Sequence, residues 1–190
     1  GLERMRQPSV AEYLGEVVAT FSQLDRASNH VNQRSGVSVR LSVANYEALA
    51  ASALRRGLRA GERQIVARVD DLDALAASSI GKIEIEALED GREGVIFDHL
   101  VAVMGDDVAI VDAFEEGLVV HTGEDLTSDE LAAVVERVPA LRNPVSALTG
   151  DDRSAASIAA AAEFVLEGLH LSKRLNKDTA ATGSTYRGRS

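Results

Sequence analysis

The sequence has no cysteine and no tryptophan, and aromatic residues make up only 4% of it. The absence of cysteine excludes a disulfide framework, a thiolate zinc site, an iron–sulfur cluster and a cysteine nucleophile. With so few aromatic side chains the core must consist mainly of Ala, Leu, Val and Ile, which favours packed helices over an aromatic-rich β-sandwich. No apolar run reaches the roughly 18 residues of a membrane span, and no pattern predicts a signal peptide. We therefore expect a cytoplasmic protein that does not engage a membrane.

Basic charge is scarce in the middle of the chain. The 190 residues carry a formal net charge of −10, divided as +3 over residues 1–60, −17 over residues 61–170 and +4 over residues 171–190. An acidic stretch of this size repels nucleic-acid phosphates, so we expect no nucleic-acid partner. We interpret it as a solvated surface, with a surface for metal ions or a cationic partner as the alternative.

Motifs for catalysis and for phosphate binding are also missing. The sequence contains no GxxxxGK[ST] loop, no GxGxxG, no HExxH and no GxSxG, and its four His residues are scattered. Adjacent acidic pairs such as Asp151-Asp152 are typical of helix caps and solvated charge rather than of a metal site. We therefore predict no catalytic residue and no metal site in this chain.

The apolar periodicity that is present predicts a series of helices. Three- and four-residue spacings indicate helices over residues 8–27, about 42–59 and about 154–175, with shorter helices between them. Residues 117–123 have an extended pattern, whereas residues 179–190 lack apolar periodicity and predict a disordered tail. The fold class predicted from these patterns is all-α, with little or no strand.

The segment from Asn32 to Arg40 is a candidate anion site. It places two arginines, Arg34 and Arg40, around Gly36 and directly before the expected helix. Guanidinium groups offer planar donors to phosphate oxygens, and a helix N-terminus adds oriented N–H groups. The alternative is a loop in which both arginines are only solvated.

Several motifs together resemble the lid subdomain of AAA+ ATPases of the magnesium-chelatase and MoxR branch. They are Gly36-Val37-Ser38-Val39-Arg40, the helix through Tyr46, Leu49 and Arg56, Gly61-Glu62, and Val69-Asp70-Asp71-Leu72. In that family a G-x-S-x-R sequence begins a lid helix and supplies the second sensor arginine. The resemblance implies that Arg40 contacts the γ-phosphate of ATP, and that Arg34 and Ser38 belong to the same nucleotide-binding segment.

The resemblance to bacterial magnesium-chelatase-like ATPases also implies a division of the chain. An N-terminal helix within residues 1–30 leads into an AAA+ lid-like helical bundle over residues 31–90, which contains the second-sensor segment. A helical C-terminal extension follows over residues 91–178, before the tail at residues 179–190.

The family's phosphate-binding loop, magnesium-holding acidic motif and first sensor have no match in this sequence. We therefore expect the chain to be the C-terminal portion of a longer ATPase that uses ATP and Mg²⁺, and to be inactive and without tightly bound cofactors on its own. The resemblance implies as partners the AAA+ core, neighbouring subunits of a ring and a von Willebrand A-type protein. The alternative is a self-contained acidic helical protein-interaction module with no nucleotide role, in which an internal acidic residue pairs with Arg40.

Overall fold

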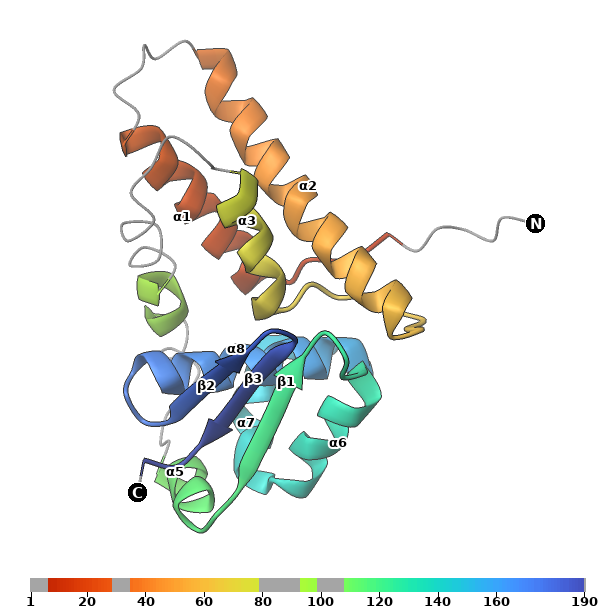
Figure 1. Cartoon of the computed structure of the whole chain (residues 1–190), viewed down its shortest axis with the longest axis vertical. Helices are drawn as coiled ribbons and strands as arrows, with labels where there is room; N and C mark the ends of the chain where they lie inside the picture. The colour runs from red at the N-terminus through yellow and green to blue at the C-terminus, as the bar shows by residue number, and fades with distance from the viewer. Residues whose placement is uncertain (1–6, 29–34, 79–92, 99–107, 190) are drawn as a thin grey trace, which may run out of the picture.

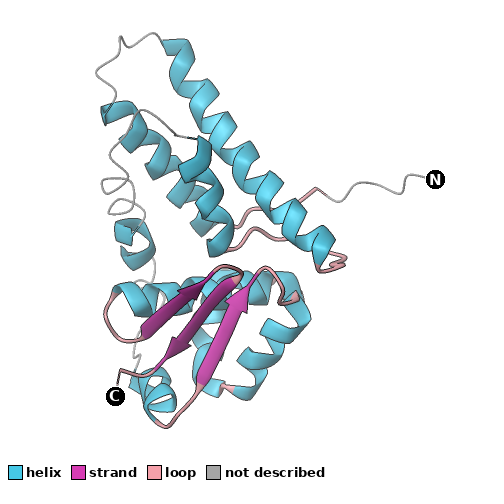
Figure 2. Cartoon of the chain, in the orientation of Figure 1, coloured by secondary structure: helices cyan, strands magenta, loops and turns pink. Residues whose placement is uncertain are grey.

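The computed structural model describes residues 7–28, 35–78, 93–98 and 108–189. Its elements form two groups that lie one above the other in Figure 1. The N-terminal group holds α1, α2, the short 3₁₀ helix η1 and α3, and the C-terminal group holds α5 to α8 and a three-stranded sheet. Figure 2 shows that strands occur only in the C-terminal group of the described chain.

The N-terminal group is a helical layer whose long members, α1 and α2, pack along each other (Figure 1). Its elements are α1 (Glu12–Ser28), α2 (Ser35–Arg59), η1 (Val69–Leu72) and α3 (Asp73–Ser78). Apolar side chains of α1 at three- and four-residue spacing fill its core, namely Tyr13, Leu14, Val17, Val18 and Phe21. A parallel bridge between Ser9 and Val66 joins the segments before α1 and after α2.

The C-terminal group surrounds one buried helix, α8. Its elements are α5 (Val108–Glu115), β1 (Val119–Gly123), α6 (Ser128–Arg137), α7 (Pro139–Thr149), α8 (Ala155–Leu171), β2 (Asn176–Ala180) and β3 (Gly183–Arg187). Every residue from 159 to 169 is buried, and α6 and α7 both pack against α8. The alanines of α8 allow this close approach from several sides.

Helix α8 also joins the two groups. Most of its apolar side chains belong to the core of the C-terminal group, whereas Phe164 belongs to the core of the N-terminal group. The Phe164 ring lies 4.6 Å from the Tyr13 ring, measured between centroids. The groups therefore share apolar packing across α8.

The sheet is antiparallel, with strand order β1-β3-β2. Its inner face contributes Val120 and Tyr186 to the core of the C-terminal group. At one end Gly123 pairs with Gly183, and the backbones approach so closely that a Cβ on Gly183 would lie 2.0 Å from the Thr122 carbonyl oxygen. Glycine is required there because any side chain would collide with backbone.

The sheet corrects two predictions from the sequence. The all-α fold class is wrong, because the described chain is mostly helical but mixed α/β. The disordered tail over residues 179–190 is wrong as far as residue 189, because β3 pairs with both β1 and β2 and Tyr186 is 1% exposed. One inward-facing aromatic and a ladder of backbone hydrogen bonds order this segment, although it has no apolar periodicity.

The three long predicted helices are confirmed, with shifted ends. The helix predicted over residues 8–27 begins at Glu12, because Ser9 is engaged by Ile65 and Ala67 through backbone hydrogen bonds of 2.9 Å each. The helix predicted from about residue 42 begins at Ser35, so the segment expected as a loop before it is partly helical. Residues 119–123 of the predicted extended stretch form β1.

Candidate functional site

Two of the three predicted nucleotide-binding residues lie in the N-terminal part of α2. Ser38 and Arg40 both belong to this helix, and Arg34 lies outside the described residues. The Arg40 side chain is exposed, and no hydrogen bond or ion pair joins it to any residue that the structure describes. An exposed guanidinium without such a bond is free to bind an anion.

Two exposed apolar side chains follow Arg40 on the same helix. Val43 is 49% exposed and Tyr46 is 46% exposed. They lie within two turns of Arg40, so this end of α2 combines a positive charge with uncovered apolar surface.

At the other end of α2 the structure contains a buried ionic network, which we define as Arg56, Glu62, Arg68, Asp71 and Glu163. The side chains of all five residues are at most 4% exposed. Four of them lie on or near α2 and η1, and the fifth comes from α8. The network therefore spans the two groups of elements.

Arg56 holds together the turn between α2 and η1. Its Nη2 donates to the Asp71 carboxylate at 3.0 Å and to the Val66 carbonyl at 2.7 Å, while Nη1 lies 3.3 Å from Glu62 Oε2. Asp71 also accepts from the Arg68 backbone N–H at 2.9 Å. These bonds fix the path of the chain between the two helical elements.

Arg68 connects this turn to the C-terminal group. Its Nη2 donates to Glu62 Oε1 at 2.8 Å and to Ser128 Oγ at 2.9 Å. Its Nη1 donates to the Leu126 carbonyl at 3.1 Å and to Glu163 Oε1 at 3.3 Å. One guanidinium thus contacts the turn after α2, the start of α6 and the middle of α8.

Glu62 binds the N-terminus of α6. Its Oε1 accepts from both the backbone N–H and the hydroxyl of Ser128, each at 2.7 Å. A carboxylate in this position satisfies an otherwise unpaired N–H and interacts favourably with the helix dipole. The same helix start also has a capping box, in which the side chains of Thr127 and Glu130 each accept a hydrogen bond from the backbone N–H of the other residue.

The protonation state of Glu163 follows from its burial. Burial raises the pKa of Glu163 to about 8, against the lowering influence of Arg68. Near neutral pH the carboxyl is therefore largely protonated, and Arg68 donates to a neutral carboxyl oxygen. Burial also raises the pKa of the nearby Asp70 carboxyl.

A second buried carboxylate, Glu167, ties the sheet to α8. Its Oε2 accepts from the Tyr186 hydroxyl at 2.6 Å and from Lys177 Nζ at 2.7 Å. Burial, followed by the charge of Glu167, raises the pKa of the Tyr186 phenol. The hydroxyl therefore remains a donor to Glu167, and both β2 and β3 are anchored on the central helix.

Three of the network residues belong to the motifs that carry the family resemblance: Arg56, Glu62 and Asp71. The structure brings these three together at one turn but keeps Arg40 apart from them. Reasoning from the sequence missed Glu163 and Glu167. The signal that could have revealed them is a pair of carboxylates four residues apart within an otherwise apolar helix, where they share one face.

The network has the chemistry of a structural junction, because both arginines are bonded to buried carboxyl groups. Within residues 7–28, 35–78, 93–98 and 108–189, no group of three or more His, Asp or Glu side chains is placed to hold a metal ion. None of the helices described in this structure has the length and apolar character needed to cross a membrane. No protein-family model, curated protein or solved structure matches the chain.

Proposed function

We propose that this chain forms the lid and C-terminal extension of a magnesium-chelatase-like AAA+ ATPase, with Arg40 contacting the γ-phosphate of ATP. The observation that carries the proposal is the exposed Arg40 side chain, which has no partner among the described residues and follows the family's G-x-S motif. Arg56 and Arg68, in contrast, are engaged by buried carboxylates. Arg40 can bind a phosphate oxygen without first losing an internal ion pair.

The exposed surface around Arg40 supports a role in docking onto an AAA+ core. Val43 and Tyr46 would be covered by a partner that also receives Arg40. The alternative function, an acidic interaction module, requires Arg40 to be paired with an internal acidic residue. The exposure of Arg40 favours the lid over that alternative.

The continuity of α2 supports a role in coupling nucleotide state to the rest of the chain. The helix runs without interruption from Ser35 to Arg59. Arg40 and Arg56 are sixteen positions apart, which corresponds to about 24 Å along a helix. A shift of Arg40 toward a phosphate would tilt a rigid helix whose far end is bonded through Arg56 and Asp71 to the turn that carries Arg68.

Arg68 extends this connection into the C-terminal group. Because it donates to Leu126, Ser128 and Glu163, movement of the turn displaces the start of α6 and the middle of α8 together. The C-terminal group is then the part that would transmit the change to ring neighbours or to a von Willebrand A-type partner. We place the intact protein in the cytoplasm, where ATP is abundant.

In the intact protein the AAA+ core would supply the phosphate-binding loop and the ligands of Mg²⁺, which neutralises phosphate charge when bound. The part played by this chain is to bring a positive charge from the lid to the γ-phosphate. A fixed guanidinium stabilises charge that is redistributed during transfer of the phosphoryl group. This chain alone is therefore proposed to release no phosphate from ATP.

The test is ATP hydrolysis by the intact protein carrying Arg40→Ala or Arg40→Lys. We expect the alanine variant to lose tenfold to a thousandfold in turnover, equivalent to roughly 1.4–4 kcal/mol of transition-state free energy. Lysine should restore little, because an ammonium group does not reproduce the planar donor fork. The melting temperature should stay at the wild-type value, because the Arg40 side chain has no bond to a described residue.

Arg55→Ala is the matched control, since Arg55 is also an exposed arginine of α2. We expect wild-type hydrolysis from this variant. Unchanged turnover with a lowered melting temperature in Arg40→Ala would refute the nucleotide role and leave only a packing role for this residue.

A further inference from the structure

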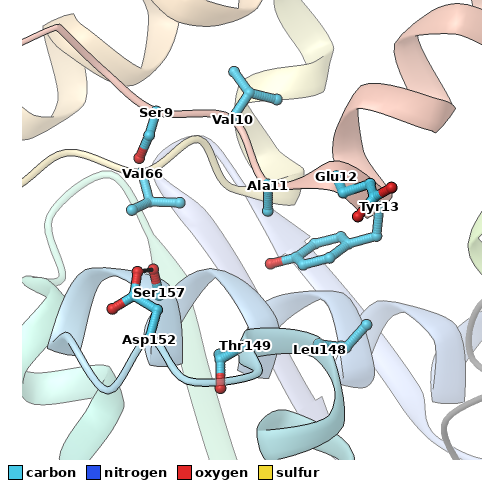
Figure 3. Close-up of a pocket in the computed structure, with 10 residues that line it drawn as sticks. All are labelled: Ser9, Val10, Ala11, Glu12, Tyr13, Val66, Leu148, Thr149, Asp152 and Ser157. Carbon is cyan, nitrogen blue, oxygen red and sulfur yellow. Dashed lines mark hydrogen bonds between the residues drawn. The ribbon is translucent and has the colours of Figure 1, made fainter.

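A cavity of about 290 Å³ lies between the two groups of elements, apart from Arg40 and from the buried ionic network. Figure 3 shows its walls: the segment before α1 on one side, and the α7–α8 connection with the start of α8 on the other. Val10, Val66 and Leu148 supply apolar surface to it. Its volume is at the lower limit of ligand pockets, which selects for a small molecule.

Tyr13 supplies a hydroxyl to this cavity from a side chain that is otherwise largely buried. The residue is 5% exposed, and in Figure 3 its hydroxyl oxygen points into the cavity, toward the side on which Asp152 and Ser157 lie. The hydroxyl has no hydrogen bond to any residue that the structure describes. The oxygen is therefore open to the cavity and available as an acceptor for a ligand.

Asp152 supplies a negative charge on the opposite wall. Its carboxylate accepts from the Ser157 hydroxyl at 2.5 Å and from the Ser154 backbone N–H at 2.9 Å. These hydrogen bonds, that from Ser157 first, lower the pKa of Asp152, so the carboxylate stays ionised at neutral pH. The Asp152 carboxylate also lies at the N-terminus of α8, so it takes the position that an anionic ligand would need there.

The charge of the lining residues selects the sign of the ligand. Glu12 is a second carboxylate at this cavity, and the described residues that line it include no lysine, arginine or histidine. An anionic ligand would meet two carboxylates and no compensating charge. A cation with a short apolar body would match both the carboxylates and the apolar walls.

We propose that this cavity binds a small primary alkylammonium ion, with the ammonium group between Tyr13 Oη and the Asp152 carboxylate. The ammonium group has donors for both oxygens, and the alkyl part lies against Val10, Val66 and Leu148. The site is independent of the proposed ATPase role, because none of its residues belongs to the second-sensor segment or the buried ionic network. Since its walls come from both groups of elements, an occupied cavity resists their separation.

The test is calorimetric titration of the purified chain with n-butylammonium chloride. We expect saturable binding with a dissociation constant in the millimolar range or tighter, and a rise in melting temperature with ligand concentration. Tyr13→Phe and Asp152→Asn should each weaken binding about tenfold or more, because each removes a hydrogen bond to a charged group. Tyr46→Phe and Asp151→Asn alter an exposed tyrosine and an exposed aspartate, and should bind as the wild type does.

Circular dichroism establishes that each variant is folded. Asp152 also accepts hydrogen bonds from Ser154 and Ser157 at the start of α8, so Asp152→Asn could unfold at a lower temperature for that reason alone. In that case the affinity of Tyr13→Phe decides, because this substitution removes no hydrogen bond seen in the described chain. Absence of saturable binding would overturn the proposal, as would wild-type affinity in Tyr13→Phe. Equal binding of n-butanol would also overturn it, because that result requires no charge recognition.

Discussion

Replacement of Glu163 by glutamine tests whether the Glu163 carboxyl is protonated in the native protein. The amide has nearly the shape of the protonated carboxyl and keeps an oxygen for Arg68 Nη1, which lies 3.3 Å from Glu163 Oε1 in the wild type. The substitution therefore removes the titration of this group and changes the packing of α8 little.

The expected magnitude follows from the shift of the pKa. Burial raises the pKa of Glu163 from 4.5 to about 8. Between these two values the native protein binds one more proton than the unfolded chain, so the free energy of unfolding falls as the pH rises, by about 1.4 kcal/mol per pH unit at most. The stabilisation from the protonated carboxyl is fully present below pH 4.5 and is lost as the pH rises through about 8.

Between pH 5.5 and 7.5 the wild type should therefore lose about 2–3 kcal/mol relative to Glu163→Gln. The assay is urea unfolding followed by circular dichroism at several pH values, with the variant curve subtracted from that of the wild type. The subtraction cancels groups that titrate equally in both proteins. Glu136→Gln, which changes a highly exposed glutamate, should give a flat difference.

Parallel pH dependence in the wild type and Glu163→Gln would refute this reasoning. A wild type that gains stability over Glu163→Gln as the pH rises would contradict it more strongly. That result would mean that Glu163 is ionised in the native protein and that its attraction to Arg68 outweighs its loss of hydration.

Two further substitutions test the junction and the sheet. Arg68→Met removes one of the two guanidinium groups that pair with Glu62, so the free energy of unfolding should fall by about 3–5 kcal/mol in urea titrations. Arg63→Met, at an exposed site, should change it by no more than about 0.5 kcal/mol. Equal losses in the two variants would contradict a central role for Arg68. Gly183→Ala places a Cβ 2.0 Å from the Thr122 carbonyl oxygen and should cost at least about 1–3 kcal/mol in the same assay. Gly15→Ala is the control, because a Cβ there has open space on α1, and it should be neutral or stabilise the protein by up to about 1 kcal/mol. A Gly183→Ala protein as stable as the wild type would disprove the close approach of β1 and β3.

The helices could be predicted from the sequence because their signals are local. Apolar residues at three- and four-residue spacing predict α1 and α8. The capping sequence from Thr127 to Glu130 is a local signal of the same kind for the start of α6. The start of α2 was placed too late, because the polar residues before Ser42 favour turns in isolation. Helix α2 as a whole packs against α1 and α3, and tertiary packing of this kind extends helices beyond their local sequence signals.

The sheet could not be predicted because its determinants are distant in sequence. Val120 pairs with Tyr186, which lies more than sixty positions further along the chain. Strands β2 and β3 carry mostly polar side chains, since only Ser184 and Tyr186 among them are buried. Gly183 lies in the segment that the sequence predicts to be disordered, whereas the close approach of β1 requires a glycine at this position.

The candidate site was predictable only in part. The motif around Arg40 identified a possible anion contact, but the exposure of its side chain depends on how α2 packs. Arg56, Glu62 and Asp71 were recognised as parts of motifs without any indication that they bond to one another. Charged residues are usually solvated, so a buried ionic network becomes visible only when the fold brings its members together.

The proposal for Arg40 is tested most directly by the ability of the intact protein to distinguish a non-hydrolysable ATP analogue from ADP. The measurement is the ratio of the two dissociation constants, obtained calorimetrically for the wild type and for Arg40→Ala. If Arg40 contacts the γ-phosphate, the substitution should weaken binding of the analogue by about tenfold or more and leave binding of ADP nearly unchanged. An unchanged ratio in a folded Arg40→Ala protein would contradict the proposed nucleotide role of this chain.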